Sequence, residues 1–192
     1  MPPSRRVLRT DADWHAVIAE IVAGARASDP TQTLVIAIDG LGGSGKSTLA
    51  EAVAAKLMGA VVHTDDFSGC ERPREWWGQL IEVVLAPVAR GEPVQPFERA
   101  RWTLDEPTEI VSIPPTRYLV LEGVRAASLA LAPYVGYAIL LDVPLETRRA
   151  RATIRYGGRL PEAWDAWSAR QNAYLREERP DERADLVAVD LR

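Results

Sequence analysis

The chain is poor in the residues that build disulfides and zinc sites. Its 192 residues include one cysteine, Cys70, and two histidines, His15 and His63. One cysteine cannot form an intramolecular disulfide, and so few Cys and His residues exclude a zinc site of the finger or HExxH type. The cysteine content therefore favours a reducing, cytoplasmic setting.

A long apolar run and a positive net charge are also missing. No segment reaches the roughly 18 uninterrupted apolar residues of a membrane span, and no apolar stretch follows the N-terminal arginines as in a targeting segment. The formal net charge of −4 gives no general attraction to nucleic acid or anionic lipid. We therefore expect neither a membrane nor a nucleic acid as partner, and any anion site must be local.

The length and the 47% hydrophobic content suit one domain spanning residues 1–192. Apolar, β-branched segments alternate with segments of helical spacing, which predicts a three-layer α/β/α fold around a five-stranded parallel sheet. The predicted strands cover 33–39, 60–66, 117–123, 137–143 and 184–190, with a short edge strand within 108–113. The predicted helices cover 11–27, 47–57, 72–93, 146–154 and 162–179.

Residues 40–47, GLGGSGKS, match the pattern G-x-x-x-x-G-K-[ST], which arises by chance in about one chain of this length in a hundred or fewer. The segment follows a predicted strand and opens a predicted helix, as a P-loop does. Glycines let the backbone approach phosphates closely, and a helix N-terminus adds a positive dipole. We predict a nucleoside triphosphate site formed by Gly40, Gly42, Gly43, Ser44, Gly45, Lys46, Ser47 and Thr48.

Acidic residues follow two of the predicted strands, where ligand chemistry gathers in open α/β sheets. Transfer of a phosphoryl group to a hydroxyl requires a carboxylate that accepts the proton, a Lys on the phosphates, and oxygen ligands for Mg²⁺. We predict Asp65 as the base, Lys46 as the phosphate contact, and Ser47, Glu122 and Asp65 as the metal site. A solvated turn or a helix cap is the alternative for Asp65 and its neighbour Asp66.

Five motifs occur in one order along the chain: IAIDGLGGSGKSTLA, HTDDF, LVLEGV, PLETRRARATIR and ADLVAVD. In these residues the chain resembles the uridine kinase and phosphoribulokinase group of P-loop kinases, which includes nicotinamide riboside and pantothenate kinases. The resemblance covers nearly all of the chain after Thr31. It implies ATP and Mg²⁺ as cofactors, Asp65 as the base toward an acceptor hydroxyl, and Glu122 as the acid of the second motif.

The resemblance also implies a short Arg-rich lid, at about 155–163, that closes over the phosphates. A closed lid excludes water and limits hydrolysis of ATP. The usual Asp after the lid arginine is replaced by Tyr156, and Gly157 and Gly158 break the helix. The arginines expected to meet the phosphates, with Arg155 as a catalytic group, are Arg151, Arg155 and Arg159. A solvated helix face paired with acids is the alternative for each of them.

Aromatic and arginine residues cluster after the second predicted strand and within 96–102. Aromatic rings could stack a ring of the acceptor, and arginines could fix its polar edges. The residues expected to contact the acceptor are Asp66, Phe67, Arg101, Trp102 and Arg125. Packing is the alternative for the neighbouring Trp76 and Trp77.

The sequence thus predicts a kinase that moves the γ-phosphate of ATP to a hydroxyl of a small metabolite. A nucleoside monophosphate kinase is a second hypothesis, which four arginines keep open: Arg72, Arg74, Arg99 and Arg101. A nucleotide switch or assembly ATPase is a third. The identity of the acceptor, the choice between ATP and GTP, and the oligomeric state, a homo-oligomer included, stay open.

Overall fold

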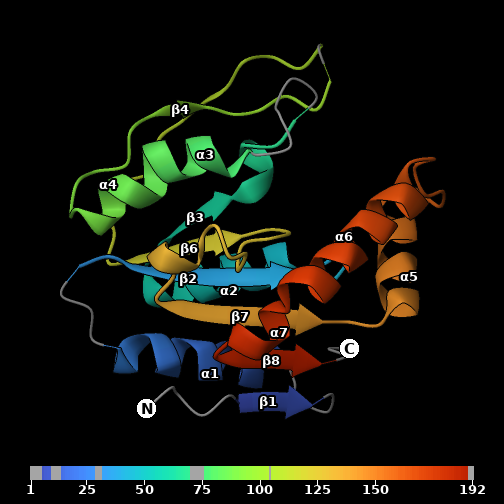
Figure 1. Ribbon diagram of the computed structural model, residues 1–192, viewed down its shortest axis with the longest axis horizontal. Coiled ribbons are helices and arrows are strands. Elements are labelled where there is room, and N and C mark those ends of the chain that lie inside the picture. Colours follow the sequence, from blue (N-terminus) through green and yellow to red (C-terminus); the bar gives the residue numbers. More distant parts are fainter. Residues whose placement is uncertain (1–5, 10–13, 29–31, 70–75, 104, 190–192) are drawn as a thin grey trace.

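A computed structural model describes residues 6–9, 14–28, 32–69, 76–103 and 105–189 (Figure 1). Its main sheet has six strands in the order β1-β8-β7-β2-β6-β3, and every neighbouring pair is parallel. The strands are β1 (Arg6–Arg9), β2 (Leu34–Gly40), β3 (Ala60–His63), β6 (Tyr118–Glu122), β7 (Tyr137–Asp142) and β8 (Leu186–Val189). The five predicted strands are all present, and β1 adds a sixth beside β8.

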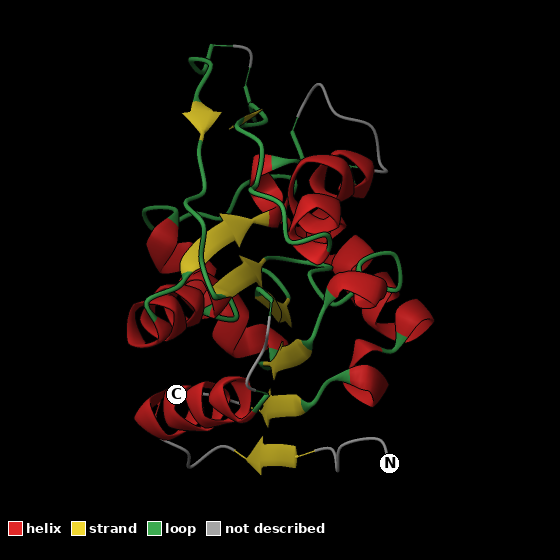
Figure 2. Ribbon diagram, turned by 90° about the vertical axis from the view of Figure 1, so that its left-hand side faces the viewer, coloured by secondary structure: helices red, strands yellow, loops and turns green. Residues whose placement is uncertain are grey.

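Helices cover both faces of this sheet, so the predicted three-layer α/β/α architecture is confirmed (Figure 2). The helices are α1 (Trp14–Ala27), α2 (Lys46–Leu57), α3 (Trp77–Leu80), α4 (Ala86–Ala89), α5 (Leu145–Arg155), α6 (Trp164–Glu178) and α7 (Pro180–Arg183). In the described part of the chain, none of them has the length and apolar character needed to cross a bilayer.

Alternating residues of β2 pack into two different hydrophobic clusters, one on each face of the sheet. Ile36 and Ile38 of β2 pack with α1 and α2 on one face, while Val35 and Ala37 pack with the α3–α4 region on the other. All seven residues of β2 are buried, as the continuous apolar run of a central parallel strand predicts. The strand that carries the glycine loop is therefore fixed from both sides.

The segment predicted as one helix over 72–93 is more irregular than its pattern suggests. It contains α3, a π-helical turn η2 (Ile81–Leu85) and α4 in direct succession. The predicted edge strand within 108–113 forms β5 (Ile110–Val111), which pairs with β4 (Phe97–Glu98) in a separate antiparallel sheet. Two short 3₁₀ turns, η1 (Thr64–Asp66) and η3 (Ala132–Tyr134), complete the described elements.

The carboxyl ends of the parallel strands lie at one edge of the sheet. Figure 1 shows α5 and α6 rising beyond this edge, with the turn that connects them at the far tip. The glycine loop, η1 and the end of β6 all lie at the same edge. Residues far apart in the sequence are thereby brought together there.

Candidate active site

The glycine loop connects the end of β2 to the start of α2. Gly43 and Gly45 have φ angles of 82° and 94°, which L side chains rarely adopt. A Cβ atom at Gly43 would lie 2.4 Å from the backbone oxygen of Arg148. Positive φ and this close approach explain why glycine is needed at Gly43.

Two arginines of α5 bind the loop through its carbonyl oxygens. The Arg148 guanidinium donates from Nε to Val143 O at 3.0 Å and from Nη1 to Gly42 O at 3.4 Å. Arg151 Nη1 donates to Ser44 O at 3.0 Å. A peptide unit is planar with C=O and N–H on opposite sides, so these contacts direct the following N–H groups away from α5. The lid candidate Arg151 thus contacts the loop backbone.

Glu122, at the end of β6, joins β3 to α2. Its Oε1 accepts hydrogen bonds from Ser47 Oγ at 3.1 Å and from His63 Nδ1 at 2.6 Å. Burial alone would raise the pKa of Glu122, but the His63 hydrogen bond and the nearby charge of Lys46 lower it on balance. The same hydrogen bond raises the pKa of His63. Glu122 is therefore held as a carboxylate.

The oxygen atoms around Glu122 fit a magnesium ion. Glu122 Oε2 is buried and has no hydrogen-bond partner in the described part of the chain. Ser47, whose hydroxyl contacts the other carboxylate oxygen, is exposed. Mg²⁺ is commonly bound by one or two carboxylates together with substrate phosphates and water. The described residues contain no group of three or more Asp, Glu, His and Cys side chains that could hold a metal. The donor set therefore suits an ion that arrives with the phosphates.

Asp65 lies in η1, directly after β3, and is exposed. Partial desolvation by the surrounding protein raises its pKa, while the charges of Lys46 and Arg155 act in the opposite direction. The predicted base, the P-loop lysine and the lid arginine are thus close enough to interact electrostatically. Glu122 also acts on Asp65, and its charge raises the same pKa.

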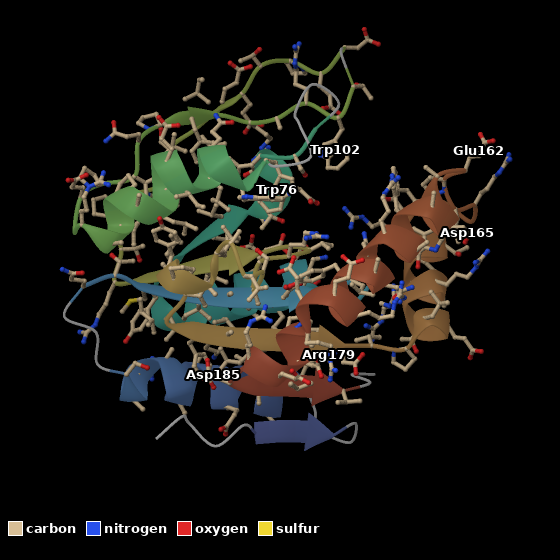
Figure 3. The ribbon with its side chains drawn as sticks, viewed as in Figure 1. Trp76, Trp102, Glu162, Asp165, Arg179 and Asp185 are labelled. Carbon is tan, nitrogen blue, oxygen red and sulfur yellow. The ribbon has the colours of Figure 1, made fainter. Side chains whose placement is uncertain are left out.

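The other predicted acceptor residues lie in different environments. Asp66 is buried, and its Oδ1 lies 2.8 Å from Arg99 Nε. Phe67 is fully buried, with its ring centroid 4.6 Å from that of Phe97, so it belongs to the core. Trp102 is 50% exposed. Figure 3 shows Trp102 and Trp76 on the segments that rise over β3, across from α5 and α6.

Arg101 and Arg125, the two remaining candidates, differ in position. Arg101 is half-buried beside Trp102. Arg125 Nη1 lies 2.8 Å from Glu178 Oε1, and its guanidinium lies 4.7 Å from the ring centre of Tyr174. The structure therefore directs Arg125 toward α6, where it packs with that helix.

The segment predicted to form the lid follows α5. Gly157 and Gly158 have φ angles of 69° and 98°, and the exposed Arg155 and Arg159 lie on either side of them. An ion pair between Arg149 Nη1 and Asp165 Oδ1, 3.1 Å apart, connects α5 to α6. In Figure 3, Glu162 and Asp165 mark the tip of this pair of helices.

Asp39, which the sequence analysis did not select, organises the centre of the site. It is fully buried at the end of β2, and burial raises its pKa. Its Oδ1 accepts from the N–H groups of Gly40 at 2.6 Å and Arg125 at 3.1 Å, and its Oδ2 from Ala127 N–H at 2.9 Å and Tyr174 O–H at 2.5 Å. The sequence does contain a signal for Asp39, since it is an acidic residue inside an apolar strand directly before the glycine loop.

Three residues of α6 bind this helix to the edge of the sheet. Gln171 Oε1 accepts from Gly42 N–H at 2.9 Å, and Tyr174 donates to Asp39. Glu178 Oε2 accepts from Leu129 N–H at 2.7 Å. The helical spacing of three and four residues puts Gln171, Tyr174 and Glu178 on one face. These three contacts were not predicted from the sequence.

Comparisons with known proteins give no match among models of protein families and no similar sequence among curated proteins. Solved structures do match. A possible uridine kinase from Bacillus stearothermophilus has a TM-score of 0.65 at 21% identity, covering 89% of this chain and 96% of the other. A candidate fructose transport system kinase from a Silicibacter species has a TM-score of 0.52 at 22% identity, covering 92% and 98%. A sugar kinase from a Janibacter species has a TM-score of 0.50 at 18% identity, covering 82% and 85%.

These likenesses, together with the glycine loop at the end of β2, show that the chain has the fold of P-loop kinases. The predicted fold class is thereby confirmed. Within that class, the chain resembles structures described as uridine and sugar kinases at low sequence identity.

Proposed function

We propose that this protein is an ATP-dependent phosphotransferase that moves the γ-phosphate of ATP·Mg²⁺ to a hydroxyl of a small metabolite. The observation that carries the proposal is the grouping of Asp65, Lys46 and the Glu122–Ser47 pair beside the glycine loop. This grouping supplies a base, a phosphate contact and oxygen ligands for a metal. All three are needed for phosphoryl transfer to an alcohol.

The glycine loop would hold the donor. The N–H groups of Gly43 and Gly45 are directed away from α5, and the N-terminus of α2 adds its dipole. Lys46 would contact the β- and γ-phosphates, and Ser47 and Glu122 would hold Mg²⁺. When bound, the ion neutralises phosphate charge and orients the γ-phosphoryl group.

Asp65 would act on the acceptor. Its carboxylate accepts the proton of the acceptor hydroxyl while the hydroxyl oxygen forms a bond to the γ-phosphorus, and the bond from that phosphorus to the β–γ bridging oxygen breaks to release ADP. Desolvation raises the pKa of Asp65, which makes the carboxylate a stronger base than an ordinary aspartate. Arg155 would close over the transferring group, where its charge meets the equatorial oxygens.

The surroundings of Arg99 favour an alcohol acceptor over a nucleoside monophosphate. Arg99 pairs with Asp66 and, through Nη1, with Glu109 Oε2 at 2.6 Å, so its charge is already balanced. Arg72 and Arg74 lie outside the described residues. A carboxylate at Asp65 would also repel a phosphate acceptor.

Replacement of Asp65 by Asn tests the assignment. We expect D65N to lose at least about 100-fold in acceptor-dependent ADP release, since general base catalysis contributes about 10²–10⁴, and to bind the nucleotide as before. A screen of nucleosides, sugars, vitamins and nucleoside monophosphates with ATP·Mg²⁺ supplies the acceptor. Asp105→Asn, on an exposed loop, is the matched control. Full acceptor-dependent activity in D65N would contradict the role of Asp65 as base.

A further inference from the structure

Gln171 sits at the glycine loop with its two polar atoms in different situations. Oε1 accepts the hydrogen bond of Gly42 N–H. Because only an oxygen can accept there, the orientation of the carboxamide is determined and Nε2 lies on the other side. In the described part of the chain, Nε2 donates to no protein group.

The carboxamide of Gln171 and the ring of Trp164 both lie close to Gly42 of the loop. A Cβ atom at Gly42 would lie 3.4 Å from Gln171 Oε1, 3.7 Å from Nε2 and 3.7 Å from Cη2 of Trp164. The carboxamide therefore lies across Gly42, and a larger residue at that position would push it away. Gln171 is half-buried, so this position costs conformational freedom that a solvated glutamine would keep.

The hydrogen bond between Gly42 and Gln171 occupies one backbone N–H donor of the loop and positions the two N–H donors of the Gln171 side chain beside it. The backbone N–H of Gly42 is taken up by Oε1, and Nε2 carries two N–H groups beside it. The hydrogen bond received at Oε1 also polarises the amide and strengthens it as a donor. The loop amides and the start of α2 cradle the inner phosphates of a bound nucleotide. The two Nε2 donors lie beside this cradle, next to Gly42, and no protein group in the described residues takes them up.

We propose that Gln171 Nε2 binds the γ-phosphate of the donor and thereby makes this protein distinguish ATP from ADP. The inference rests on the proposed function, because it requires a nucleoside triphosphate in the glycine loop. Since α6 carries both Gln171 and Tyr174, binding of the terminal phosphate also strengthens the attachment of the post-lid helix to the sheet edge.

Two substitutions separate phosphate binding from attachment of the helix. Gln171→Glu keeps an oxygen that accepts from Gly42 N–H, removes both donors and adds a negative charge. Gln171→Met keeps the length of the side chain and removes both functions. Arg170→Ala, exposed on the same helix, is the control. Calorimetric titration with ADP and with a non-hydrolysable ATP analogue, each with Mg²⁺, gives the ratio of the two affinities.

We expect both Gln171 variants to bind the ATP analogue about 10- to 100-fold more weakly and ADP within about threefold of the unaltered protein, as loss of a hydrogen bond to a charged group predicts. An unchanged ratio of the two affinities in Gln171→Glu would overturn the inference, and so would an equal loss for both nucleotides in Gln171→Met. If the unaltered protein binds neither nucleotide, the proposed function fails as well. The titration of the unaltered protein therefore distinguishes this failure from a failure of the Gln171 inference alone.

Discussion

Replacement of Tyr174 by Phe removes one hydroxyl from the centre of the site and leaves the packing unchanged. Tyr174 is fully buried, and its hydroxyl donates to Asp39 Oδ2 at 2.5 Å. Burial raises the pKa of Tyr174 further above neutrality, so the hydroxyl remains a donor. Three backbone N–H groups still bind Asp39 in the variant. We expect the free energy of unfolding to fall by about 1.5–3 kcal/mol, the usual contribution of a hydrogen bond to a charged group.

The loss of unfolding free energy in Tyr174→Phe should depend on pH, and the ionisation of the buried Asp39 carboxyl determines whether it grows or shrinks as the pH rises. Burial raises the pKa of Asp39 in the folded state above its unfolded value, so its stabilising contribution is present at low pH and is lost as the pH rises through the folded pKa. The Tyr174 hydrogen bond acts against this rise in pKa. Tyr174→Phe therefore loses more stability at high pH than at low pH.

Urea unfolding followed by tryptophan fluorescence, between about pH 8 and about pH 5, measures this difference. Tyr134→Phe is the matched control, because that tyrosine is half-buried and the hydrogen bonds found in the described residues do not involve its hydroxyl. The control should stay within about 0.5 kcal/mol of the unaltered protein. A loss below about 0.5 kcal/mol for Tyr174→Phe, or a loss that is equal at every pH, would refute the central role given to Asp39.

Three further predictions concern the glycine loop, its support in α5 and the unrelated Gly78 of α3. Gly43→Ala should weaken nucleotide binding, measured by calorimetry, by at least about tenfold, because its Cβ would lie 2.4 Å from the Arg148 oxygen at a φ of 82°. Gly78→Ala places its Cβ in open space, so we expect it to raise the free energy of unfolding by about 0.5–1 kcal/mol. Arg148→Lys should lower the free energy of unfolding by about 1–3 kcal/mol in urea titrations, because an ammonium cannot reach Val143 O and Gly42 O together. Unchanged nucleotide affinity in Gly43→Ala, or an unchanged free energy of unfolding in Arg148→Lys, would contradict the contact between the loop and α5.

The layers, five of the six strands of the main sheet and the glycine loop were predictable because each depends on local pattern. An apolar run of the length of β2 or β6 is typical of a strand buried on both faces, and GLGGSGKS specifies its own turn. β1 was not predicted, because its four residues, Arg6–Arg9, carry no apolar run and are paired only through β8. The π-helical turn in the 72–93 segment likewise has no signature in periodicity.

The contacts within the site were less predictable than its members. The strand-end rule predicts Asp65 and Glu122 at the edge that carries the loop, since all parallel strands end at the same edge, and Glu122 contacts Ser47 there. The roles of the two acids stay predictions. The rule gave no information on which aromatic residue faces inward, and Phe67 lies in the core. Asp39 and Gln171 act through partners that are 135 and 129 residues away in the chain, a relation that no single-sequence pattern contains.

The attachment of Gly42 O and Ser44 O to the α5 arginines has a thermodynamic consequence for ligand binding. A loop whose peptide planes are set during folding loses little conformational entropy when an anion arrives. Association should therefore be driven by enthalpy, with a small entropic penalty from the loop itself. The ordering of other segments, such as the predicted lid at about 155–163, would then make the larger protein contribution to the binding entropy, and calorimetry of a variant shortened in that segment would measure its share.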